Sequence, residues 1–189
     1  MRRSILACAG LLACCFGSIG GGAAQATAAN AVTGARAAQQ HEAALAWLGS
    51  QIVGYQQATW RWQRLMGVPL VQTTGRLLTE MSMPDIERAV RLWEQRAAAA
   101  RRQAANPPHK AAFLCIHHYE GSWTDSGGPY YGGLQMNLGF QQTYAPWLVR
   151  AKGTADHWTP LEQIWTAEKA SRSRGFWPWP NTARFCGLI

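Results

Sequence analysis

The chain of 189 residues has few charged residues and is especially poor in acidic ones. Only 15% of its residues are charged, and ten Asp and Glu stand against 18 Lys and Arg, so the formal net charge is +8. With 48% apolar residues, the composition excludes disorder throughout and fits one globular domain with an appended segment. The arginines are scattered among acids without any nucleic-acid-binding motif, so we expect an anionic or neutral partner and no nucleic acid.

The chain also lacks an apolar run long enough to span a membrane. The uncharged stretch from Ile5 to Phe16 is about a dozen residues, short of the ~20 that a membrane helix needs. Arg2 and Arg3 precede it and an Ala-rich stretch follows it, a pattern typical of a secretory signal peptide. We therefore predict a signal peptide over residues 1–28 and a secreted or cell-wall protein with no transmembrane span.

A lipid anchor is the alternative to free secretion. Leu11, Leu12, Ala13 and Cys14 resemble a lipobox, and acylation of Cys14 would tether the protein to the outer face of the membrane. Removal of residues 1–28 as a signal peptide leaves only Cys115 and Cys186, which allow one intramolecular disulfide in an oxidising compartment.

The composition changes at Asn106–Pro108, which divides a helical segment, residues 29–108, from a glycine- and aromatic-rich domain, residues 109–189. In the first segment apolar residues recur at spacings of three and four, which predicts a helix that ends at Gly67. They are Leu45, Leu48, Ile52, Tyr55, Thr59, Trp62 and Met66.

A second helix is expected from about Ser82, with Pro84 in its first turn and Ile86, Val90 and Trp93 on one face. The two helices are expected to pair as a hairpin-like segment. A dimerising coiled coil is the alternative for the same apolar stripe.

The second segment contains the candidate chemistry. Phe113, Ile116 and Glu120 share one face of a predicted helix that ends at Gly121. Desolvation and the negative end of a helix both favour the protonated form of a carboxyl group at such a position, which suits a general acid. A glutamate that caps the helix or pairs with an arginine is the alternative.

The residues after Glu120 carry a family resemblance. Glu120-Gly-Ser-Trp leads into Tyr130-Tyr-Gly-Gly-Leu-Gln135, and later into Gly175-Phe-Trp-Pro-Trp-Pro180 and Cys186. Over about 80 residues this resembles the catalytic domain of the resuscitation-promoting factors, which are lysozyme-like and transglycosylase-like proteins. The resemblance implies an α+β, mostly helical, lysozyme-like fold that cleaves the glycan strands of peptidoglycan, as a hydrolase or a lytic transglycosylase.

The resemblance also implies roles for single residues. Glu120 is the expected catalytic acid, and Gln135, Tyr130 and Tyr131 are the expected substrate-binding residues. Phe140 stands where the family has a threonine that hydrogen-bonds the substrate, and Asn137 is a candidate to make that hydrogen bond instead. The family disulfide implies a Cys115–Cys186 bridge, with Cys115 one helical turn farther from the glutamate than usual.

Two further side chains are candidates for the cleft. Asp125 is the one acid near Glu120 in sequence and could serve as a second carboxylate, or it could instead stabilise a Ser-Gly-Gly turn. Trp123 offers a flat face for a sugar ring. The remaining tryptophans of this segment, including Trp177 and Trp179, are expected in the core.

Three rival functions use the same segment. Cys115, His117 and His118 suggest a metal, but His117 points away from the other two on a helix, so we expect neither metal nor cofactor. A cell-wall cysteine peptidase would pair Cys115 with His157 or His118. A module that binds peptidoglycan without cutting it is the third alternative.

Overall fold

A computed structural model describes residues 22–73, 75 and 77–189 of the chain, with side chains from residue 30 onward. The chain divides into two compact units, Met1–Ala44 and Leu45–Ile189. In the first unit the described residues belong to helix α1 (Gly22–Met66), and the side chains of residues 30–43 are exposed. Cys14 and residues 1–21 of the predicted signal peptide lie outside the described residues.

The second unit is mostly helical with one small antiparallel sheet, which confirms the α+β, mostly helical class. Tyr130 pairs with Asn137 in that sheet. Within the described ranges, no helix combines the length and the apolar character that a bilayer crossing requires. After α1 the elements are η1 (Leu78–Glu80), α2 (Met83–Ala104), α3 (Lys110–Glu120), β1 (Tyr130–Tyr131), β2 (Met136–Asn137), α4 (Leu138–Tyr144), α5 (Pro146–Lys152), η2 (Ala155–His157), α6 (Pro160–Arg174) and α7 (Pro180–Phe185).

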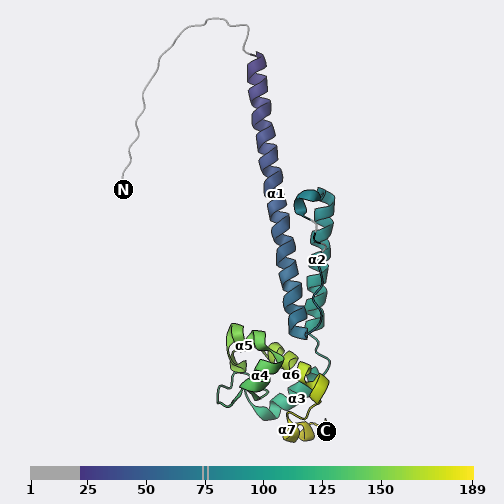
Figure 1. The fold of residues 1–189 in the computed structure, drawn as a ribbon, viewed down its shortest axis with the longest axis vertical. Helices are drawn as coiled ribbons and strands as arrows, with labels where there is room; N and C mark the ends of the chain where they lie inside the picture. The colour runs from purple at the N-terminus through teal and green to yellow at the C-terminus, as the bar shows by residue number, and fades with distance from the viewer. Residues whose placement is uncertain (1–21, 74, 76) are drawn as a thin grey trace, which may run out of the picture. The chain divides into compact units, whose positions relative to one another are not determined.

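The predicted apolar stripe of α1 packs against α2 of the same chain (Figure 1). Leu48 and Ile52 share a buried cluster with Ile86 and Trp93. The ring of Trp93 meets that of Trp60 edge to face at 6.2 Å. Both predicted ends are confirmed: α1 stops at Met66, where Gly67 takes a φ of 67°, and α2 starts after Ser82, whose side chain accepts a hydrogen bond from Asp85 N–H.

The larger hydrophobic core contains residues from both sides of the Asn106–Pro108 boundary, including the C-terminal ends of α1 and α2. Leu65 and Met66 of α1 and Ala104 of α2 are buried in one cluster with residues of α3 and α6. The Trp165 indole N–H donates to the Ala104 carbonyl at 2.7 Å, and the Arg172 guanidinium donates to the Met66 carbonyl at 2.7 Å. Helix α6 is therefore bonded directly to the C-terminal ends of α1 and α2.

Helix α3 is fixed at both ends. At its start, the Glu168 carboxylate, 2% exposed, accepts hydrogen bonds from the His109 backbone N–H at 2.5 Å and from the His109 ring at 3.0 Å. Arg172, four residues after Glu168 on the same helix, bonds the end of α1 and not Glu168. At its end, the Glu120 carboxylate accepts a hydrogen bond from the Thr182 hydroxyl of α7 at 2.8 Å. In its middle, Cys115 forms a disulfide with Cys186, the residue that follows α7.

The tryptophans near the C-terminus divide between core and surface. Trp158, Trp165 and Trp179 are buried, as predicted. Trp177 is 63% exposed, so its expected place in the core is wrong. Trp177 and Trp179 lie in the same connection between α6 and α7, and only Trp179 turns inward, where its indole N–H donates to the Leu134 carbonyl at 2.7 Å.

Candidate active site

Glu120 is the last residue of α3, and its side chain is half-buried beside α7. The Thr182 hydroxyl donates a hydrogen bond to Glu120 Oε1 at 2.8 Å. Phe113 and Ile116, on the same helix face, are fully buried and fix the orientation of this face. The carboxyl group borders a surface hollow lined by Glu120, Tyr130, Gln135, Pro178, Trp179, Pro180 and Asn181.

Gln135 reaches this hollow from a strained position in the turn between β1 and β2. Its φ is 46°, a left-handed backbone that is uncommon for a residue with a side chain. The Gln135 amide nitrogen donates to Asp125 Oδ2 at 2.8 Å and to the Gly132 carbonyl at 3.0 Å. Strained residues of this kind concentrate at functional sites, where the surrounding bonds hold them in place.

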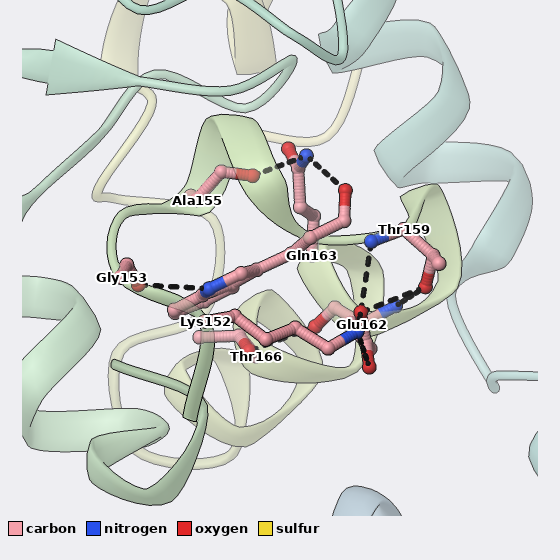
Figure 2. A network of polar contacts seen from close by, with 8 residues as sticks. Lys152, Gly153, Ala155, Thr159, Glu162, Gln163 and Thr166 are labelled. Carbon is pink, nitrogen blue, oxygen red and sulfur yellow. Dashed lines mark hydrogen bonds and ion pairs between the residues drawn. The ribbon is translucent and has the colours of Figure 1, made fainter. Parts of the chain in front are cut away.

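A second side chain, Gln163 of α6, holds the same turn from inside the protein. It is fully buried, and its Oε1 accepts a hydrogen bond from the Gly133 N–H at 2.8 Å. Its amide nitrogen donates to the carbonyls of Trp123 and Ala155, each at 2.8 Å. Figure 2 shows the hydrogen bond from this amide to the Ala155 carbonyl.

The helix that carries Gln163 begins at a strong cap. Thr159 and Glu162 form a capping box, and Lys152 donates to both oxygens of the Glu162 carboxylate, at 2.7 and 2.8 Å (Figure 2). The start of α6 is therefore well fixed, which positions Gln163 one residue farther along.

A second hollow adjoins the first and shares Tyr130, Gln135, Pro178 and Trp179 with it. Asn137 borders this hollow while its Oδ1 caps α4 by accepting from the Phe140 N–H at 2.8 Å. The two hollows together form a groove, which we call the α3–β2 groove. The second hollow is lined by Tyr130, Gln135, Met136, Asn137, Phe140, Arg174, Pro178 and Trp179.

Of the predicted site residues, the structure brings Glu120, Tyr130, Gln135 and Asn137 together at the α3–β2 groove. Trp123 and Tyr131 do not line it. The Trp123 ring stacks on His117 at 3.8 Å, and the His117 ring in turn donates from Nδ1 to the Gly133 carbonyl at 3.0 Å. Trp123 thus supports the back of the glycine turn.

Asp125 has both carboxylate oxygens engaged next to the groove. Oδ1 accepts from the Gly127 N–H at 3.0 Å, a bond that closes the predicted turn, and Oδ2 accepts from Gln135. Among the described residues that line the groove, Glu120 is the one carboxylate. The geometry therefore offers one acid at the groove and a second carboxylate that positions Gln135.

The rival sites find little support in the geometry. Cys115 is bonded to Cys186, so it has no thiol to act as a peptidase nucleophile. Nδ1 of His157, the other residue of the proposed peptidase pair, lies 3.2 Å from Asp156 Oδ2. In the part of the chain that the structure describes, no three His, Cys, Asp or Glu side chains are grouped to hold a metal ion.

Sequence reasoning missed four residues of the site. Thr182 and Asn181 lie on α7, and no motif marks either of them. Trp179 is expected in the core, and although it is only 4% exposed it also lines the groove. Arg174 lies in the last turn of α6, and no sequence motif marks it as a site residue.

No protein-family model, curated protein or solved structure matches the chain. The assignment of a function therefore depends on the groove itself and on the sequence motifs around it.

Proposed function

We propose that this protein is a secreted or cell-wall enzyme that cleaves the glycan strands of peptidoglycan, with Glu120 as general acid. The observation that carries the proposal is the place of Glu120, a half-buried carboxyl group that borders a groove lined also by an exposed tyrosine, side-chain amides and a tryptophan. Aromatic faces and amides are the groups that bind sugar rings in proteins. The lysozyme-like fold and the likeness to resuscitation-promoting factors are parts of this proposal.

In the proposed reaction, Glu120 gives its proton to the glycosidic oxygen as the bond from that oxygen to the anomeric carbon breaks. Positive charge develops on the sugar ring in the transition state. Water, or the 6-hydroxyl of the same sugar, then bonds to the anomeric carbon and loses a proton to the Glu120 carboxylate, which restores the acid. Because Glu120 is the one carboxylate among the described residues that line the groove, it serves both as the acid in bond cleavage and as the base when water or the 6-hydroxyl attacks.

Cleavage of purified sacculi by the wild type, Glu120→Gln and Glu94→Gln tests the proposal. Gln keeps the shape of Glu but has no proton to give, so Glu120→Gln should lose at least about 100-fold in rate. Glu94 is exposed on α2, so Glu94→Gln should cleave like the wild type and controls for loss of one negative charge. Equal rates for Glu120→Gln and the wild type would contradict the proposal.

Binding measurements separate an enzyme from a binding module. Retention of peptidoglycan binding by Glu120→Gln together with loss of cleavage fits the enzyme. Binding without cleavage by the wild type itself would favour the non-catalytic module. Mass spectrometry of the products distinguishes reducing ends, left by a hydrolase, from 1,6-anhydro ends, left by a lytic transglycosylase.

A further inference from the structure

The α3–β2 groove has a carboxyl group in one hollow and a guanidinium in the other. Glu120 borders the hollow next to α7, and Arg174, the last residue of α6, borders the hollow next to β2. The two hollows share four lining residues, so a ligand that occupies both would extend from the acid to the arginine. Of the described residues that line the hollow next to β2, Arg174 is the only charged one.

The Arg174 guanidinium has no hydrogen bond or ion pair to any residue of the described ranges, and its side chain is exposed. Its neighbour Arg172 differs in this respect, because Arg172 is bonded to the carbonyls of Met66 and Gly67. Asn137 faces the same hollow and uses its oxygen to cap α4. The hollow therefore offers guanidinium and amide N–H donors and no opposing carboxylate.

We propose that Arg174 is a specificity-determining residue that binds a carboxylate of the glycan substrate. This inference rests on the proposed function, and it defines the substrate more narrowly: a strand with a carboxylate near the sugar rings, next to the bond that is cut. A guanidinium presents paired N–H donors that match the two oxygens of a carboxylate, and such charge-assisted bonds are stronger than neutral ones.

Peptidoglycan offers this carboxylate in two chemical settings. A muramoyl sugar without its stem peptide has a free lactyl carboxylate on the ring, and a sugar with its stem peptide has carboxylates along the peptide. The hydrogen-bonding chemistry is the same in both. Substrates that differ only in these groups can therefore identify the source.

A cation in the last turn of a helix also stabilises the helix end, and this effect is independent of any ligand. Arg174 lies in that turn of α6. The two roles differ in one observable: only carboxylate binding makes the effect of a substitution depend on the charge of the substrate.

The test compares the wild type, Arg174→Gln, Arg174→Lys and Arg184→Gln on three substrates. The substrates are intact sacculi, strands freed of stem peptides by an amidase, and the same freed strands with their carboxyl groups reduced to alcohols. Arg184 is an exposed arginine of α7 that lines neither hollow, and its substitution controls for loss of a positive charge.

For Arg174→Gln we expect KM to rise about tenfold on a substrate with the carboxylate, with kcat nearly unchanged, and no rise on the reduced strands. Arg174→Lys should retain part of the affinity for the carboxylate, because lysine keeps the positive charge but lacks the paired N–H donors of a guanidinium. A rise on freed strands assigns the lactyl carboxylate, and a rise confined to intact sacculi assigns the stem peptide. The same fold-change on intact sacculi, freed strands and reduced strands would overturn the inference.

Equilibrium binding keeps this result separate from the proposed catalysis. Glu120→Gln protein, with and without Arg174→Gln, is titrated with soluble fragments of intact, freed and reduced strands. A loss of affinity that depends on the carboxylate supports the inference even if no cleavage is found, in which case only the catalytic proposal fails. Equal affinity of both proteins for all three fragments overturns the inference, whatever the cleavage assay shows.

Discussion

The Gln163 side chain bonds to the Gly133 backbone, 30 residues earlier, with Oε1 2.8 Å from the amide nitrogen. Gly133 precedes Leu134 and Gln135 in the turn that forms one wall of the groove. The other end of the Gln163 amide binds the carbonyl of Trp123, in the loop after Glu120. One buried amide thus links the segments on both sides of the site.

Gln163→Met should therefore destabilise the fold markedly. Methionine fills a similar volume but leaves the Gly133 N–H and the carbonyls of Trp123 and Ala155 buried without these partners, which should lower the free energy of unfolding by about 2–4 kcal/mol. Urea denaturation measures this. Gln142→Met, at an exposed position of α4, is the matched control and should change stability by less than about 0.5 kcal/mol. Equal stability of the two variants would contradict the prediction.

The hydrogen bond between Thr182 and Glu120 should appear as a coupling energy at neutral pH. In a cycle of Thr182→Val, Glu120→Ala and the double variant, we expect a coupling of about 1 kcal/mol in the free energy of unfolding. Thr182→Ser, which keeps a hydroxyl, should retain most of the coupling. Additive effects of Thr182→Val and Glu120→Ala would show that the bond does not contribute in solution.

Loss of the disulfide should cost stability through the long loop that it closes. Cys115 and Cys186 are 71 residues apart, so the loop-entropy model gives about 4 kcal/mol. We expect the double variant Cys115→Ser, Cys186→Ser to unfold at lower temperature than the wild type, and reductant to lower the wild type to the level of the variant. Peptide mapping without reductant should recover the two cysteines as one cross-linked pair. A wild-type Tm unchanged by full reduction would argue against this role.

Lys169 of α6 predicts a pH dependence of stability. Burial, together with the positive charge of Arg172, lowers the pKa of Lys169 from 10.5 to about 8. Between pH 8 and 10.5 the unfolded chain thus binds more protons at this residue than the folded chain. The free energy of unfolding therefore rises with pH in this window, because Lys169 destabilises the folded state less as it loses its proton.

Lys169→Met removes this contribution. The variant should exceed the wild type in stability at pH 7, by at most about 3 kcal/mol, and the difference should shrink as the pH approaches 10.5. Denaturation at a series of pH values measures it, with Lys110→Met, at an exposed position, as the control for removing a positive charge. A difference that stays constant from pH 7 to 10.5 would contradict the prediction.

The sequence predicted those features that depend on neighbouring residues. Ser82 and the Thr159–Glu162 pair start helices because a side-chain oxygen meets an N–H three residues away, a distance that the spacing itself encodes. Glycines 67 and 121 end helices for an equally local reason. The placement of Glu120 on an apolar helix face also follows from its spacing to Phe113 and Ile116.

The features that sequence reasoning missed depend on contacts between distant segments. Thr182 is 62 residues from Glu120, and its role appears only when α7 packs on α3. Trp177 and Trp179 have the same Trp-Pro surroundings, yet only the latter finds a buried acceptor, the Leu134 carbonyl. Glu168 bonds with His109 rather than with Arg172, because tertiary packing brings the start of α3 to its carboxylate.

The bonds from α6 to the ends of α1 and α2 bear on how the chain can be shortened. A fragment that starts at His109 would leave the Trp165 N–H without the Ala104 acceptor and would uncover the core face that Leu65 and Met66 now close. The groove-bearing part therefore depends on its helical neighbour for its own hydrophobic interior. Transplanting residues 109–189 onto another protein would require a substitute for those two helix ends.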